Sequence, residues 1–167
     1  MKSKNMNMLV RLALVVTLTL AGMIPAIPAV VATAHSEEQA GKLEGTWRVQ
    51  VTIRDCQSGA ALRTFPALLT FAQGGTLTET TTGFSPALRT PGHGFWQHTG
   101  DHSYSAVSEA FLFNQVGIWT ATQRLTQSIE IADNPDELTS TATNEIFDTS
   151  GNLLMAGCAT AVASRLQ

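Results

Sequence analysis

The sequence predicts an all-β protein, an eight-stranded antiparallel up-and-down barrel. Residues after Gly45 alternate strictly between apolar and polar as far as Arg54, which is typical of a strand with one buried face. Seven further strand-like runs follow, joined by short turns, and no amphipathic helix is evident among them. The first and last runs also show a matching register that would close the sheet. A sandwich of two sheets is the main alternative.

The matching register follows from residue numbers. Across an antiparallel pair, the sum of two facing residue numbers stays constant. Trp47 with Arg165 gives 212, and Cys56 with Cys158 gives 214, so that two independent pairs agree to within a diagonal step. The same parity places Trp47 and Arg165 on one face and both cysteines on the other. A ring of eight strands leaves an interior that side chains fill or that holds one small ligand.

The eight expected strands are bounded by turn residues such as Gly, Asn, Asp and Ser. Pro66 lies near the start of the second strand, where proline is tolerated. Gly74 and Gly75 indicate a tight hairpin between the second and third strands. The longest irregular stretch, 83–94, contains two prolines and is a candidate rim loop. The expected strands are 46–55, 65–72, 76–82, 95–99, 104–113, 118–132, 137–147 and 153–166.

A secretory signal peptide is expected over residues 1–34. Three basic residues come first, an apolar run follows, and small residues end in Ala32-Thr33-Ala34. Pro25 and Pro28 interrupt the apolar run, which argues against a membrane-spanning helix. We therefore expect an exported protein, periplasmic or extracellular, with no membrane insertion after cleavage.

The remaining chain reads as a single domain. Residues 35–44 are expected to be a flexible lead-in and residues 45–167 the barrel. Without the leader's three basic residues, 7 Lys and Arg stand against 13 Asp and Glu, a net charge of −6. That charge opposes nucleic acid and anionic membranes as partners. The oligomeric state is left open.

The two cysteines, Cys56 and Cys158, both fall in the exported part, where thiols usually pair. Two free buried thiols are the alternative. No cofactor is indicated. His93, His98 and His102 lie close in sequence, but they lack a metal-binding spacing, so no metal site is predicted. No nucleophile motif is present, and no catalytic residue is assigned.

Gly45-Thr46-Trp47 in the first strand, together with Arg165 near the end of the last, resembles the lipocalins and the wider calycin group, and small exported bacterial proteins of the same kind whose role is not established. The resemblance implies an eight-stranded barrel with a cup-shaped cavity for a small apolar molecule. It also implies that Gly45, Trp47 and Arg165 are structural, with the arginine packed across the tryptophan at the closed end.

Candidate ligand-binding residues come from the aromatic strands. Glu109 shares a strand face with two phenylalanines, and the aromatic count favours that face as the inner one. An inward Glu109 would have a raised pKa and could orient a ligand or act as an acid or base. If instead Tyr104, Ala106, Ala110 and Leu112 face inward, Glu109 lies in solvent. The candidate cavity residues are Phe71, Trp96, Glu109, Phe111, Phe113 and Trp119, although aromatic residues at alternate strand positions are more often plain core.

Three functions fit this sequence. The first is an exported, non-enzymatic barrel that binds a small apolar or amphipathic molecule in a cavity of about 300 Å³ or more. The second is an enzyme that resembles the cyclase and dirigent-type barrels, with Glu109, Gln127 or Asn144 inside. The third is a filled barrel that serves as a structural or interaction module with an exposed apolar patch.

Overall fold

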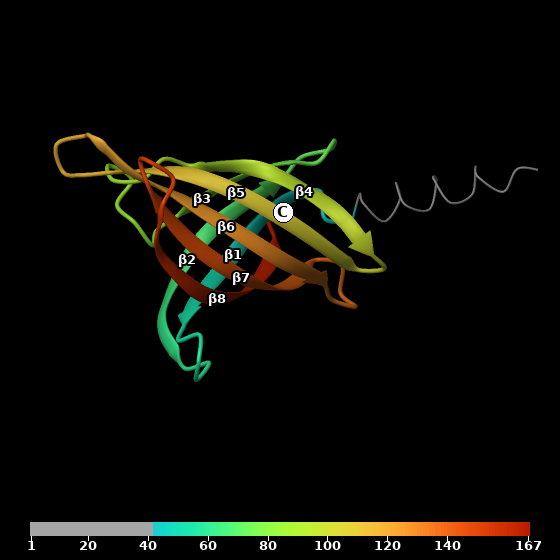
Figure 1. The fold of residues 1–167 in the computed structure, drawn as a ribbon. Coiled ribbons are helices and arrows are strands. Elements are labelled where there is room, and N and C mark those ends of the chain that lie inside the picture. Colours follow the sequence, from blue (N-terminus) through green and yellow to red (C-terminus); the bar gives the residue numbers. More distant parts are fainter. Residues whose placement is uncertain (1–41) are drawn as a thin grey trace, which may run out of the picture.

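The computed structural model describes residues 42–167, and these form a closed antiparallel barrel (Figure 1). Each strand pairs with its neighbour in sequence, and β1 pairs with β8. The all-β barrel predicted from the sequence is confirmed, whereas the predicted signal peptide lies outside the described residues. No helix in residues 42–167 is long and apolar enough to cross a membrane. The strands are β1 (Gly45–Arg54), β2 (Ala61–Phe71), β3 (Thr76–Thr81), β4 (Gly92–Gly100), β5 (Ser103–Phe113), β6 (Trp119–Ile131), β7 (Glu137–Asp148) and β8 (Leu153–Arg165).

The seam between β1 and β8 has the predicted register. Trp47 faces Arg165, and the ladder continues to Arg54 opposite Cys158, with the residue sum of 212 throughout. Cys56 and Cys158 form a disulfide with their Cα atoms 5.3 Å apart, which confirms the expected pair. The disulfide joins the turn after β1 to the middle of β8 on the outer surface, so it fastens the two strands that close the ring.

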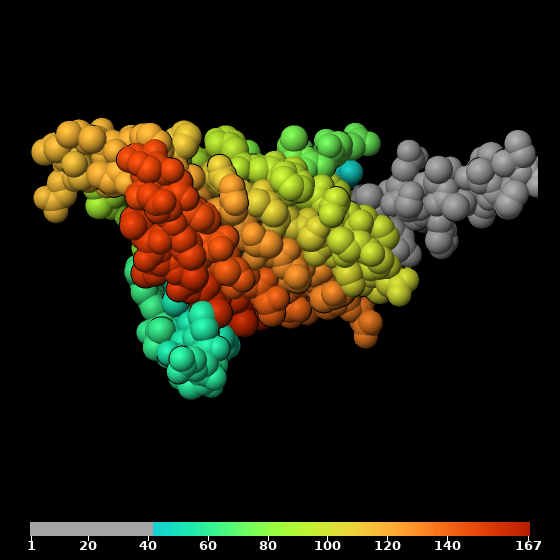
Figure 2. Space-filling model, in the orientation of Figure 1, coloured from blue at the N-terminus to red at the C-terminus, as the bar shows by residue number. Residues whose placement is uncertain are grey.

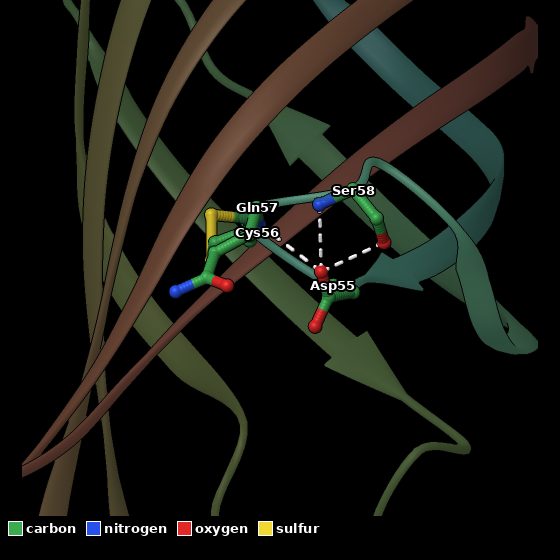
Figure 3. Close-up of a disulfide and its surroundings, with 5 residues drawn as sticks. Asp55, Cys56, Gln57 and Ser58 are labelled. Carbon is green, nitrogen blue, oxygen red and sulfur yellow. Dashed lines mark hydrogen bonds between the residues drawn. A yellow bond between two sulfur atoms is a disulfide. The ribbon is translucent and has the colours of Figure 1, made fainter.

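The turn that carries Cys56 is held by one carboxylate (Figure 3). Asp55 Oδ1 accepts hydrogen bonds from the backbone N–H of Gln57 at 3.1 Å and of Ser58 at 2.7 Å, and from the Ser58 hydroxyl at 2.8 Å. These bonds favour the ionised form, and they hold the pKa of Asp55 below its ordinary value. The disulfide therefore begins from an ordered turn.

The two ends of the barrel differ in their packing. At the closed end lie the turns after β2, β4 and β6, together with residues 42–44 and the end of β8 (Figure 1). Aromatic rings fill the interior there: the Phe71 ring lies edge-on to Trp96 at 6.1 Å, and Trp96 lies 6.0 Å from Tyr104. Leu43, within the expected lead-in, is completely buried in this core. The closed half is therefore a packed core.

The expected orientation of β5 is wrong. Its buried side chains are at even positions, so Tyr104, Ala106, Ala110 and Leu112 face inward and Glu109 faces solvent. The interior beside β5 is already occupied by aromatic side chains from β2 and β4 at the closed end. The small Ala106 therefore faces inward opposite Trp96, and the larger Phe111 lies outside.

Strand β2 begins at Ala61, four residues earlier than predicted, which places Pro66 in its middle. The Pro66 carbonyl points away from β1 and accepts a hydrogen bond from the Thr82 N–H at 3.0 Å. Since the N and O of one strand residue point the same way, the missing N–H of Pro66 also faces that side. The β2–β3 ladder ends at Ala67, so this ladder needs no donor from the proline.

Candidate functional site

Arg165 seals the closed end of the barrel. Its guanidinium carbon lies 4.3 Å from the centre of the Trp47 ring, as the resemblance to the calycins implies. Its terminal nitrogens donate to the carbonyls of Glu44 at 2.5 Å and Lys42 at 2.6 Å. The Trp47 indole N–H donates to the Leu43 carbonyl at 2.9 Å. These contacts hold residues 42–44, which lead into β1, across the closed end of the barrel.

Gly45 makes this seal possible. Its φ is +119°, a conformation that favours glycine, and a Cβ there would lie 2.9 Å from an Arg165 nitrogen. On the other side of the guanidinium, Arg165 Nε donates to Asp136 Oδ1 at 2.8 Å. Gly45, Trp47 and Arg165 therefore have structural positions at the closed end, remote from the open half.

The open half of the barrel contains a cavity of about 70 Å³. Most of its wall is apolar, including Val51, Ile53 and Ala161, and its polar groups come from Glu79, Gln127, Ser140 and Asn144 among others. The volume is well below the ~300 Å³ typical of a drug-sized ligand site. The small residues of β7 and β8 therefore mostly accommodate larger side chains opposite, and they leave a limited space.

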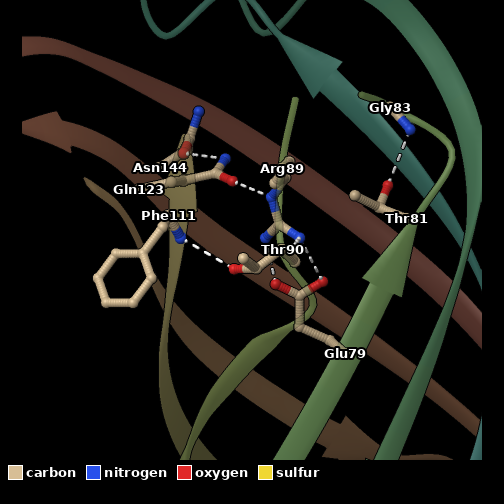
Figure 4. A network of polar contacts seen from close by, with 8 residues as sticks. All are labelled: Glu79, Thr81, Gly83, Arg89, Thr90, Phe111, Gln123 and Asn144. Carbon is tan, nitrogen blue, oxygen red and sulfur yellow. Dashed lines mark hydrogen bonds and ion pairs between the residues drawn. The ribbon is translucent and has the colours of Figure 1, made fainter. Parts of the chain in front are cut away.

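A buried polar network borders this cavity (Figure 4). Arg89 and Glu79 form an ion pair in which each side chain is only 3% exposed. Arg89 Nε also donates to Gln123 Oε1 at 2.6 Å, and Gln123 Nε2 donates to Asn144 Oδ1 at 2.7 Å. Four elements are thereby linked: β3, the loop after it, β6 and β7.

The loop 82–91 positions Arg89 because it runs along the end of β5. The Thr90 N–H donates to the Phe111 carbonyl at 3.1 Å, and the Phe113 N–H donates to the Leu88 carbonyl at 2.9 Å. On β4, Gly92 leaves room for the Glu79 carboxylate, since a Cβ at Gly92 would lie 2.1 Å from Glu79 Oε1. The expected rim loop thus supplies the cation of the network.

The structure places the six candidate cavity residues elsewhere. Two are buried in the closed half, Phe71 and Trp96. Glu109 lies outside and pairs with Arg124 at 2.6 Å, both side chains being almost half exposed. Ligand binding by these residues stays untested, and the residues lining the cavity do not include them. The remaining three are Phe111, Phe113 and Trp119, at the ends of β5 and β6.

Sequence reasoning missed Glu79, Arg89 and Gln123, although it named Gln127 and Asn144. The alternation of Leu77 and Glu79 on β3 contains the signal for one of them, because the apolar Leu77 predicts an inward face that Glu79 shares. Arg89 lies in an irregular loop without periodicity, so no local pattern indicates its burial.

Other candidate chemistry is weaker. In residues 42–167, no group of three or more His, Cys, Asp or Glu side chains could hold a metal ion.

Large apolar side chains are exposed at the open end, where the β5–β6 hairpin projects (Figure 2). Trp119 there packs edge-on against Phe111, with ring centres 6.0 Å apart. The exposed apolar residues of the β5–β6 and β7–β8 hairpin tips are Val116, Ile118, Trp119, Leu153, Leu154 and Met155.

The closed sheet, the sealed end and the cavity define a small up-and-down barrel that is consistent with a calycin-like architecture. No family model and no curated protein matches the sequence. Among solved structures, the crystal structure of Rv2717c from M. tuberculosis is similar over 84% of this chain and 99% of that one, with 16% identity and a TM-score of 0.36. A similarity this distant carries no information about function.

Proposed function

We propose that the protein is an exported, lipocalin-like barrel that binds one small apolar or amphipathic molecule in its open half. The observation that carries the proposal is the cavity itself, a mostly apolar space with a few polar groups converging on it. The disulfide supports export, because such bonds persist in oxidising compartments. The exported protein is expected to begin at His35, which its intact mass would show.

The size of the cavity restricts the ligand. A volume of about 70 Å³ suits a molecule of a few heavy atoms. Phe65 and Phe84 also line this space. Gly83 passes close to the Phe65 ring, since a Cβ at Gly83 would lie 2.7 Å from that ring. A larger ligand therefore requires the loop that carries Phe84 to move.

The test combines two measurements. Mass spectrometry of small molecules that co-purify with the exported protein should find a bound compound. Titration with short-chain alcohols, followed by NMR, should shift the resonances of Val51, Ile53 and Ala161. A161L should abolish the shifts of Val51 and Ile53 because it fills the cavity, whereas A156L, on the outer face of β8, should not. The proposal fails if wild type shows neither a bound compound nor shifts, or if A161L binds like wild type.

A filled barrel that serves as an interaction module is the second candidate. The packed closed half and the exposed apolar hairpin tips favour it. Its test is W119S combined with L154S, which removes apolar surface from both tips. This double variant should lower association of the protein on size-exclusion chromatography, and in a filled barrel neither wild type nor variant should bind the alcohols. Unchanged elution of wild type as a monomer at all concentrations would argue against this candidate.

A further inference from the structure

The charge around the cavity is balanced by one ion pair. Among the described residues that line the cavity, Glu79 is the one that carries a charge. Arg89 lies directly behind it, and its guanidinium meets both carboxylate oxygens. Since both side chains are almost completely buried, neither charge is solvated by water to any large extent. The pair as a whole adds no net charge to the cavity.

Four of the five N–H bonds of the Arg89 guanidinium are donated to protein partners. Nε donates to Gln123, one terminal nitrogen donates to Glu79 and to the Thr90 carbonyl at 3.0 Å, and the other donates to Glu79. All three nitrogens are therefore engaged. Arg89 is not among the described residues that line the cavity, so an anionic ligand there meets the Glu79 carboxylate before it meets this arginine.

Two amides remain for a ligand. Asn144 uses its oxygen to accept from Gln123 (Figure 4), which leaves its amide nitrogen as a donor at the cavity wall. Gln127 lies on the same inward face of β6 as Gln123, four residues further on. It lines the same cavity and is only 8% exposed. Both are neutral groups that donate to oxygen acceptors such as a carbonyl or a hydroxyl.

We infer that the cavity selects an uncharged ligand with a hydroxyl or carbonyl oxygen, and that the Glu79–Arg89 pair makes it reject ions. This inference rests on the proposed function and specifies its ligand class. A charged ligand would lose its hydration on entry and would find no unpaired opposite charge, whereas a neutral oxygen exchanges water for the Asn144 or Gln127 amide. The selectivity therefore comes from the pairing of the two charges.

The experiment compares propanol, propionate and propylammonium, which are similar in size and differ in charge. NMR titrations would follow the side-chain amide resonances of Gln127 and Asn144. Wild type should bind propanol at least about tenfold more tightly than either ion, because an ion must be desolvated without a partner. If wild type binds an ion as tightly as propanol, the inference fails and the proposed function stands. If it binds none of the three, the inference fails, and the proposed function fails with it unless a small molecule co-purifies with the protein.

Variants of the ion pair should change this preference in opposite directions. E79Q leaves Arg89 unpaired, so propionate should become the preferred ligand. R89Q leaves Glu79 unpaired, so propylammonium should become preferred. The matched controls E109Q and R124Q break the exposed pair on the outer face and should keep the wild-type order. An unchanged order in a folded E79Q or R89Q would overturn the inference.

Breaking a buried ion pair can prevent folding, so a third variant keeps the pair intact. N144D places a new carboxylate at the cavity wall and preserves the oxygen that accepts from Gln123. It should favour propylammonium over propanol, and a retained preference for propanol would count against the inference. Circular dichroism of each variant identifies those that fold.

Discussion

Arg165→Lys tests whether the seal at the closed end depends on the shape of the guanidinium. Lysine keeps the charge and most of the apolar stem, but its single nitrogen cannot reach the carbonyls of Lys42 and Glu44 and the Asp136 carboxylate at once. The structure gives the arginine four protein partners through hydrogen bonds and one through its stack on Trp47. The substitution therefore removes several contacts without removing the charge.

The expected loss follows from those contacts. A hydrogen bond from a charged donor contributes about 1.5–3 kcal/mol, and lysine loses at least one bond to a carbonyl. The stack on Trp47 adds about 0.5–1 kcal/mol. The Asp136 carboxylate is almost half exposed, so its ion pair adds less than about 1 kcal/mol. We expect the free energy of unfolding to fall by about 2–4 kcal/mol.

Urea unfolding, followed by tryptophan fluorescence and circular dichroism, measures this loss. Arg124→Lys is the control, because its exposed ion pair with Glu109 should be worth less than about 1 kcal/mol. If Arg165→Lys lies within about 0.5 kcal/mol of wild type, the guanidinium does not hold the entering chain and the argument for a sealed end is refuted.

Three further predictions concern the disulfide, an unpaired hydroxyl and the one tyrosine. Replacing Cys56 and Cys158 by serine should lower the free energy of unfolding by about 4.7 kcal/mol in the chain-entropy account, since the bond closes a separation of 102 residues; a reducing agent should then have no further effect in calorimetry. Ser108→Ala should raise that free energy by about 1 kcal/mol in urea unfolding, because the buried hydroxyl has no hydrogen-bond partner among the described residues; a loss would show that the hydroxyl is satisfied. Burial raises the pKa of Tyr104 above 10.0. Because the folded-state pKa exceeds the unfolded value, stability should be complete below pH 10 and fall as the pH rises through the folded pKa. Tyrosinate absorbance reports this group alone, as the sequence has a single tyrosine, and a midpoint below 10.0 would contradict the burial.

The architecture was predictable because its signals are long-range and redundant. Trp47 and Cys56 lie near opposite ends of one strand, and each has a partner on the last strand at nearly the same residue sum. An antiparallel ladder ties every pair to one register, so a single agreement between two pairs is informative about the whole seam. Strand ends were less predictable, since β2 starts four residues and β4 three residues before the expected positions.

The inner face of β5 was not predictable from its own residues. Both faces contain apolar side chains, and the side with Phe111 has the larger ones. Which face turns inward depends on the space left by other strands: Trp96 already lies beside Ala106 on the neighbouring strand. Near the open end, Phe111 instead packs against Trp119 outside the barrel. A count of the aromatic residues on one strand does not show which side chains of the other strands already fill the barrel interior.

The polar network was predictable only in part. Glu79 alternates with an apolar inward residue, so its position inside follows from periodicity. Arg89 comes from a loop, and its burial depends on the backbone bonds of Leu88 and Thr90 to β5. Those bonds are possible because β4 pairs with β5 only as far as His93 opposite Glu109, which leaves the end of β5 without a partner from β4. A single sequence does not show such a gap in the ladder.

The seam has a practical consequence for handling the molecule. The Leu166 N–H donates to the Thr46 carbonyl at 2.8 Å, and Arg165 contacts Lys42 and Glu44. The polypeptide chain therefore enters the first strand and leaves the last strand at the same, closed end of the barrel. A short linker could join these positions, and a circularly permuted protein could start at the β7–β8 turn with all eight ladders retained. Immobilising the protein through Gln167 would likewise point the cavity away from the support.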